Sequence, residues 1–274
     1  MTTSEPKTIA PIGVFDSGVG GLTVLRSIRE AFPSEDLIYL GDTARVPYGN
    51  KGAETVRRYS VNVARFLVDR GCRALVIACN TASAQALDAV IESVAVPVVD
   101  VIRPVAQYIG EGTAQTVVVL GTRGTVGSGA YPREIARTGR TLTVVQQPCP
   151  LLVPLAEEGW LQGEVPSQVV RTYLNPVLAG LAVDTIVLGC THYPLLREVI
   201  AREAAAICGY TPAILDGGFH ASRVLGALPT MQQRPARGPG QTHFCVTDDP
   251  AGFLRVASLF LGHEVESAEH VDIT

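Results

Sequence analysis

Residues 74–81 are Ala74-Leu-Val-Ile-Ala-Cys-Asn-Thr81, and residues 185–192 repeat the pattern as Thr185-Ile-Val-Leu-Gly-Cys-Thr-His192. Each stretch has the pattern of a buried strand that ends in a cysteine and polar residues, and a helical pattern follows. Residues 12–20, a strand pattern that runs into a glycine-rich turn, are echoed by residues 117–125. The offsets are similar, 111 residues between the cysteines and 105 between the turns. This repeat predicts two similar α/β halves that face each other across a cleft.

Short β-branched runs alternate with stretches of helical length along the rest of the chain. The predicted strands are residues 12–15, 37–40, 74–78, 96–99, 116–120, 142–145, 185–188, 213–215 and 243–246. The predicted helices are residues 22–32, 54–70, 81–93, 165–181 and 195–207. The alternation indicates an α/β fold with two pseudo-symmetric domains, each a mostly parallel sheet flanked by helices, and an active site in the cleft between them.

The repeat also suggests where the domains divide. We place residues 1–102 and 212–274 in a first α/β domain that carries Cys79, and residues 103–211 in a second that carries Cys190. The proline- and arginine-containing residues 232–240 have the composition of a surface loop rather than of a linker between domains.

Composition and charge disfavour several kinds of partner. The chain has 274 residues and a formal net charge of -4, so we expect no broad basic surface and no nucleic-acid partner. Only 18% of the residues are charged, which leaves apolar surface that a subunit interface could cover, so we expect an oligomer. No apolar run approaches the length of a membrane span, and residues 1–11 lack the apolar core of a signal peptide. We therefore expect a cytoplasmic protein.

The reactive side chains also limit the cofactors. The six cysteines form no Cys-x-x-Cys pair and the five histidines are scattered, so we expect reduced thiols and no metal site. A pyridoxal enzyme needs a lysine for its Schiff base, and Lys51 is the only lysine besides Lys7 in the N-terminal tail. We expect no cofactor.

Cys79 and Cys190 are the leading candidates for catalysis. Each follows a strand and precedes a helix, where backbone N–H groups and the helix dipole favour a thiolate and lower a thiol pKa from about 8.5 toward neutrality. Two thiols on opposite sides of a bound carbon can remove a proton from one face and return one to the other. A single cysteine is more often a buried core residue, and this interpretation holds for the other four, Cys72, Cys149, Cys208 and Cys245.

Polar residues gather beside the same strand ends. Asp16 precedes a glycine-rich turn whose N–H groups could hold a carboxylate; the aspartate itself could orient an ammonium group or cap a helix. The turn lacks the lysine of a P-loop. His192 could polarise groups near Cys190 or be structural. Hydroxyl groups in the second glycine-rich turn could bind a carboxylate or cap a helix, and they belong to Thr122, Thr125 and Ser128.

Four fragments of the chain, taken in order, resemble the glutamate racemases of the aspartate/glutamate racemase superfamily. They are Phe15-Asp16-Ser17-Gly18-Val-Gly-Gly-Leu, Gly41-Asp42-Thr43 with Pro47-Tyr48-Gly49, Cys79-Asn80-Thr81-Ala82, and Gly189-Cys190-Thr191-His192-Tyr193-Pro194-Leu. The resemblance implies that L-glutamate is racemised to D-glutamate without a cofactor, for peptidoglycan biosynthesis.

The resemblance also implies roles for individual residues. Cys79 and Cys190 become the pair that donates and accepts the proton. Asp42, Glu157 and His192 would assist the thiols, and Asp16 could tune one of them. The substrate contacts would be Asp16, Ser17, Tyr48, Gly49, Asn80, Thr81, Thr191 and His192, together with Thr122 and Thr125 of the second turn.

Two other functions stay open at this point. The first is racemisation of aspartate or a hydantoin; aspartate racemases typically have Glu after the second Cys-Thr and lack Pro-Tyr-Gly, so His192 and residues 47–49 favour glutamate. The second is an amino-acid binding module, since two α/β lobes around a cleft also describe solute-binding proteins. The resemblance implies a homodimer, but the residue patterns do not locate its interface. No role is assigned to residues 216–219 or to a regulatory ligand, nor is either cysteine assigned to one enantiomer.

Overall fold

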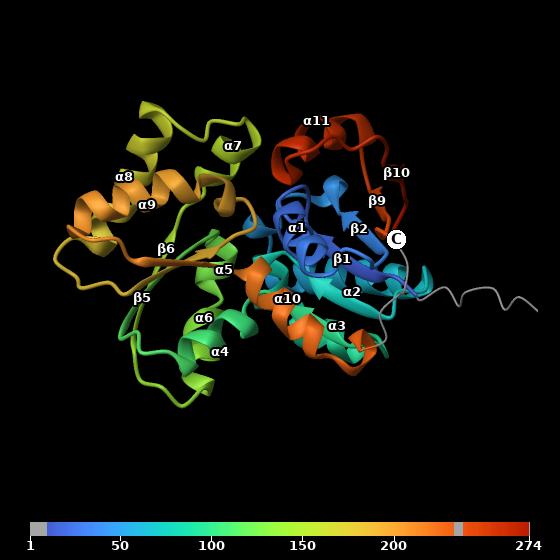
Figure 1. Cartoon of the computed structure of the whole chain (residues 1–274), viewed down its shortest axis with the longest axis horizontal. Helices are drawn as coiled ribbons and strands as arrows, with labels where there is room; N and C mark the ends of the chain where they lie inside the picture. The colour runs from blue at the N-terminus through green and yellow to red at the C-terminus, as the bar shows by residue number, and fades with distance from the viewer. Residues whose placement is uncertain (1–9, 233–237, 274) are drawn as a thin grey trace, which may run out of the picture.

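The chain builds two separate parallel sheets, and a computed structural model describes residues 10–232 and 238–273 of it. The first sheet has the strand order β10-β9-β2-β1-β3-β4 and the second has the order β6-β5-β7-β8. Figure 1 shows the two domains built on these sheets lying side by side. Residues 233–237, within the predicted surface loop, lie outside the described residues.

The first sheet is centred on β1 (Ile12–Asp16), which pairs in parallel with β2 (Leu37–Gly41) and β3 (Ala74–Ile77). β4 (Val98–Asp100) extends the sheet beyond β3. β9 (Thr242–Val246) and β10 (Glu269–His270) extend it beyond β2.

The second sheet is centred on β5 (Thr116–Gly121), which lies between β6 (Thr143–Pro148) and β7 (Thr185–Gly189). β8 (Ala213–Asp216) pairs with β7. The order β6-β5-β7-β8 therefore reproduces the order β2-β1-β3-β4 of the first sheet, which is the repeat expected from the sequence.

All nine predicted strands are present, and the two-residue β10 is an addition. The pairing of β8 with β7 differs from the predicted division, which placed residues 212–274 with the first domain. Because β8 corresponds to β4 in the repeat, it completes the second sheet before the chain returns to the first. The five predicted helices correspond to α1 (Leu22–Ala31), α2 (Ala53–Asp69), α3 (Asn80–Ser93), α8 (Glu164–Leu178) and α9 (Arg197–Cys208).

The remaining helical elements connect and cover the sheets. The α-helices are α4 (Arg103–Glu111), α5 (Arg123–Gly127), α6 (Ala130–Arg137), α7 (Leu152–Glu157), α10 (Gly217–Ala227) and α11 (Pro250–Leu261). The 3-10 turns are η1 (Thr43–Arg45), η2 (Tyr48–Asn50), η3 (Tyr193–Leu196) and η4 (Pro229–Met231). Within the described ranges, no helix has both the length and the apolar character needed to cross a membrane.

Apolar packing joins the two domains. One cluster of buried side chains extends from Val14 and Val76 in the first sheet to Leu120 and Leu188 in the second. Parallel strands buried on both faces need such continuous apolar runs, and helices supply the covering layers. The helix α10 packs against α1 and α4, so it lies where the domains meet (Figure 1).

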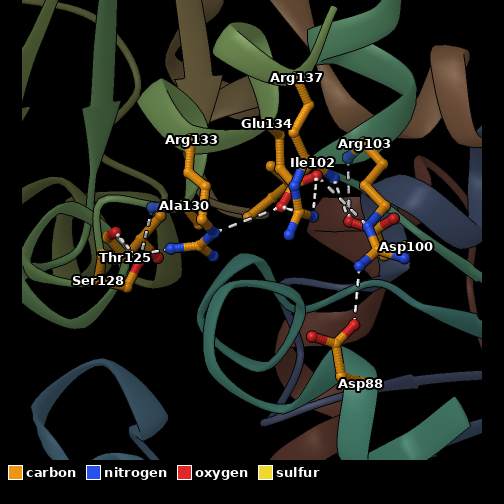
Figure 2. A network of polar contacts seen from close by, with 10 residues as sticks. All are labelled: Asp88, Asp100, Ile102, Arg103, Thr125, Ser128, Ala130, Arg133, Glu134 and Arg137. Atoms are coloured by element: carbon orange, nitrogen blue, oxygen red, sulfur yellow. Dashed lines mark hydrogen bonds and ion pairs between the residues drawn. The ribbon is translucent and has the colours of Figure 1, made fainter.

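A charged bridge also spans the connection between the domains (Figure 2). Asp100, at the end of β4, accepts hydrogen bonds from the N–H groups of Ile102 and Arg103 at 2.8 and 3.1 Å. The Arg103 guanidinium lies 2.8 Å from Asp88 of α3 and 3.5 Å from Glu134 of α6. One arginine thus links a helix of the first domain to a helix of the second.

Candidate active site

The two domains bring Cys79 and Cys190 to one cavity. Cys79 caps the N-terminus of α3, and its Sγ accepts a hydrogen bond of 3.5 Å from the N–H of Ala82. Cys190 follows β7 directly, but the 3-10 turn η3 separates it from α9, whereas the sequence predicted a helix after each cysteine. Both side chains are 5% exposed and line a cavity of about 190 Å³.

The cavity gathers most of the predicted substrate contacts. Besides the cysteines, its predicted lining residues are Ser17, Tyr48, Gly49, Asn80, Thr81, Thr122, Thr191 and His192. Hydroxyl and amide groups on several of these side chains, and on both sides of the cleft, could donate hydrogen bonds to the carboxylates of a small ligand.

The other lining residues were not predicted as site residues, and they are Pro47, Asn50, Arg123, Pro150, Val153 and Pro154. Arg123 follows Thr122 in the second glycine-rich turn, so adjacency could have suggested it. Pro150, Val153 and Pro154 carry no chemical signal, and only the folded structure brings them to the cavity.

Three predicted site residues lie behind the cavity wall. Asp16 accepts a hydrogen bond of 2.8 Å from the N–H of Gly18 and a weaker one of 3.5 Å from the hydroxyl of Thr191. Asp42 accepts hydrogen bonds from the hydroxyls of Tyr48 and Thr247. These buried carboxylates hold lining residues in place. The third residue is Thr125 of the second domain, and its hydroxyl contacts the lining residue Thr81.

Three threonine hydroxyls that contact one another link the two domains beside the cavity. The Oγ1 atom of Thr81 lies 2.9 Å from that of Thr122 and 3.2 Å from that of Thr125. Thr122 also caps α5 by accepting a hydrogen bond of 3.1 Å from the N–H of Thr125, so capping and site geometry coexist here. Ser128, the other candidate of this turn, donates to the carbonyl of Thr125 and does not line the cavity.

A chain of polar contacts runs from Cys190 to the protein surface. Cys190 Sγ lies 3.8 Å from His192 Nδ1, and His192 Nε2 lies 2.9 Å from Glu157 Oε1. Burial opposes a charge on His192, but the contacts with Cys190 and Glu157 outweigh it and raise the pKa of the imidazole to about 10. His192 is therefore charged at neutral pH, and the cation is in position to stabilise a thiolate at Cys190.

Cys79 has different surroundings. Burial, followed by the charge of nearby Asp16, raises the pKa of the Cys79 thiol to about 12. The N–H of Ala82 and the hydroxyl of Ser17, which lies 3.7 Å from Sγ, act in the opposite direction but are outweighed. The predicted lowering of this pKa is wrong because the helix terminus is buried next to a carboxylate, so the resting form is the neutral thiol.

The groups that could hold a metal or a Schiff base lie elsewhere. Lys51 does not line the cavity. Among the residues that the structure describes, one group of possible metal ligands comes together, His243, Cys245 and Glu269, at the edge of the first sheet. Arg70 contacts both carboxylate oxygens of Glu269, at 3.0 and 2.7 Å, so a metal ion would have to displace this guanidinium.

Comparisons with known proteins point to one family. Residues 12–217 match the Asp/Glu/Hydantoin racemase family. The chain is 48% identical over 265 residues to the glutamate racemase of Geobacter metallireducens, with 96% of each chain covered. Glutamate racemase from Francisella tularensis, solved in complex with D-glutamate, has a TM-score of 0.87 at 36% identity, covering 96% of this chain and 98% of that one. Glutamate racemase from Thermus thermophilus, in complex with β-chloro-D-alanine, has a TM-score of 0.85 at 41% identity, covering 98% of both chains.

Proposed function

Because the chain belongs to the Asp/Glu/Hydantoin racemase family and is an amino-acid racemase, we propose that it interconverts L- and D-glutamate with Cys79 and Cys190 as the two bases. The observation that carries the proposal is the position of these thiols, which come from equivalent places in two repeated domains and line the same cavity. The family membership excludes the simple binding module that the sequence left open.

The proposed reaction is two proton transfers at the α-carbon. A thiolate removes the α-proton from one face, and the bonding electrons pass into the adjacent carboxylate to give a planar, enolate-like intermediate. The opposite thiol then donates its proton to the other face. One cysteine ends as a thiol and the other as a thiolate, so the reverse reaction starts from the state that the forward reaction leaves.

The surroundings of the two cysteines differ, as suits a reaction in which one accepts a proton and the other donates one. His192 offers a cation to a thiolate at Cys190, while the buried Cys79 rests as a thiol that can donate its proton. Before the substrate binds, the two cysteines therefore differ in their surroundings, with His192 beside Cys190 and burial favouring the neutral thiol at Cys79. Burial is the main cause of the raised pKa of Cys79, and the charge of Asp16 adds to it; a substrate ammonium bound near Ser17 would offset this second effect and help the roles to exchange.

The other lining residues hold the substrate in this proposal. Neutral donors on Asn80, Thr81, Thr122 and Thr191 would bind carboxylate oxygens. Such donors also stabilise the negative charge that develops on the α-carboxylate when the proton leaves. Tyr48 and Gly49 would close the cavity from the first domain.

The biological setting follows from the product. We propose that D-glutamate from this reaction supplies peptidoglycan biosynthesis in the cytoplasm, where the six free cysteines would stay reduced. We also propose a homodimer, since Trp160 and Val165 are each more than half exposed. Light scattering during size-exclusion chromatography would measure the mass.

The experiment that tests the function is incubation of the purified protein with L-glutamate in heavy water, without pyridoxal phosphate or added metal. We expect D-glutamate with deuterium at the α-carbon, detected by chiral chromatography and mass spectrometry. Absence of both inversion and α-exchange would overturn the two-base proposal. A clear preference for aspartate or a hydantoin in parallel incubations would assign another substrate of the same family.

A further inference from the structure

Arg123 is a cation of the cavity wall to which the proposed mechanism gives no role. Of the residues that line the cavity, it is the only arginine or lysine. Within residues 10–232 and 238–273, its guanidinium has no hydrogen-bond or ion-pair partner. The side chain is exposed, whereas the two cysteines are buried, so Arg123 lies at the mouth of the cavity rather than at its floor.

The other arginines in this part of the molecule are engaged. Arg123 also lines a larger neighbouring cavity of about 750 Å³, together with Arg57, Arg103 and Arg133. Arg57 pairs with Glu54, Arg103 pairs with Asp88, and Arg133 lies 3.5 Å from Glu134. Figure 2 shows the contacts of Arg103 and Arg133. Arg123 is thus the one guanidinium of this group that is free to meet a ligand.

Close backbone packing places Arg123 beside the opposite domain. A Cβ atom at Gly49 would lie 2.8 Å from Cβ of Thr122, and one at Gly124 would lie 3.0 Å from the carbonyl oxygen of Gly49. A methyl group at Gly49 would force the Thr122 side chain to shift, and one at Gly124 would crowd the Gly49 carbonyl, so η2 and α5 approach each other closely here. The two domains therefore contact each other between η2 and α5, and this contact places Arg123 at the edge of the cavity.

The charges around the cavity favour a cation at the position of Arg123. Glutamate brings two carboxylates and one ammonium group, so the substrate carries a net negative charge. The hydroxyl and amide donors that line the cavity are neutral. The positive charge of His192 is already shared between Cys190 and Glu157. No other lining side chain offsets the second carboxylate of the substrate.

We propose that Arg123 is a specificity-determining residue that draws a dicarboxylate into the cavity and favours it over amino acids with uncharged side chains. The inference rests on the proposed glutamate racemase function. An exposed cation at a cleft raises the local concentration of anionic substrate and speeds encounter, and this effect weakens as salt screens the charge. Arg123 would therefore act on substrate capture and not on the proton transfers.

The test compares Arg123→Gln with Arg65→Gln and with Arg123→Lys. Arg65 lies exposed on α2, outside the cavity, so its replacement changes the net charge equally. We expect Arg123→Gln to lower kcat/KM for L-glutamate about tenfold at low ionic strength, mainly through KM, with kcat within about twofold. The fall of kcat/KM with added salt should flatten in this variant, and Arg123→Lys should restore most of both effects.

A non-reacting dicarboxylate provides a second readout. The inhibition constant of glutarate should rise by about the same factor in Arg123→Gln and stay unchanged in Arg65→Gln. Wild-type KM, salt dependence and glutarate inhibition in Arg123→Gln would overturn the inference while leaving the racemase function intact. A loss confined to kcat would also overturn it. Failure of the wild-type protein to racemise glutamate would instead overturn the proposed function on which the inference rests.

Discussion

Glu157 holds His192 from the far side of the imidazole ring, with 2.9 Å between Oε1 and Nε2, while Nδ1 of the same ring faces Cys190. The carboxylate ends α7 and the histidine follows β7, so 35 residues of chain separate them. A carboxylate on the outer nitrogen orients the ring and favours its charged form. The charge state of the Cys190 side of the site therefore depends on a residue that does not line the cavity.

Glu157→Gln should shift the alkaline limb of the pH-rate profile to lower pH. The pKa of His192 is raised to about 10, so the charged ring persists through neutral pH and is lost as the pH rises through that value. The amide keeps the contact but removes the charge, which lowers the pKa of His192 toward its ordinary value of about 6.5. We expect kcat/KM to decline at a lower pH than in the wild-type protein, measured by circular dichroism of glutamate.

Glu158→Gln is the matched control, because Glu158 is the next carboxylate in the chain and is exposed. The pH-rate profile of Glu158→Gln should match that of the wild-type protein. An unchanged alkaline limb in Glu157→Gln would show that the charge of Glu157 does not control His192.

Cys79→Ser and Cys190→Ser should each abolish racemisation, by about 10³-fold or more, because a serine hydroxyl is far less acidic than a thiol. Since the two enantiomers have equal free energies, kcat/KM must fall equally from both. Each variant should still exchange the α-proton of one enantiomer, a different one for each, which nuclear magnetic resonance in heavy water detects. Cys208→Ser, outside the cavity, is the control. Full racemisation by either active-site variant would assign that cysteine to packing.

Much of this architecture is predictable because local sequence and repeat agree. The run from Thr185 to Leu188 favours a strand, since its β-branched and apolar side chains fit a buried parallel sheet. Its echo of residues 74–77 then predicts that Cys79 and Cys190 occupy equivalent positions. The sheet to which β8 belongs depends on long-range pairing with β7, and spacing along the chain does not determine it.

The site was only partly predictable, for a physical reason. Sequence motifs identify the types of residue that follow each strand, and residues of these types line the cavity, so this part of the site was predictable. The pKa of Cys79 depends on how deeply the thiol is buried and on the distance to Asp16, and neither is a property of local sequence. Arg123 gains its significance from the absence of a partner among the described residues, which only the folded arrangement reveals.

Glu134→Gln should lower the free energy of unfolding by about 1–2 kcal/mol, because it weakens the bridge between the domains. Glu134 is 10% exposed and lies 2.8 Å from Arg137 and 3.5 Å from Arg103. Figure 2 shows these residues together. The arginines are partly solvated, which keeps the expected loss modest. Urea unfolding measures it, with Glu30→Gln as control, since Glu30 is 72% exposed and lies 3.9 Å from Arg26. Equal stability of the two variants would contradict a role for the bridge.

Gly20→Ala should impair catalysis by displacing the residues that follow Cys190. A Cβ atom at Gly20 would lie 2.4 Å from both Nδ1 of His192 and Oγ1 of Thr191. The imidazole cannot retreat freely, because Phe260 packs edge-on against it at 5.4 Å and is fully buried. We expect kcat/KM to fall about 10²-fold and the free energy of unfolding to fall by about 1–3 kcal/mol, from kinetic and urea measurements.

The matched control for this change is Gly52→Ala. A Cβ atom there meets no atom within 4 Å, and the backbone, at φ −68, suits alanine. This variant should keep wild-type kinetics and stability, because it adds the same methyl group where space is open. If Gly20→Ala retained wild-type kcat/KM, the ring of His192 would be free to move without cost. Gly20 permits the glycine-rich turn after β1 to approach residues 191–192 closely. That close approach would then not determine the geometry at Cys190.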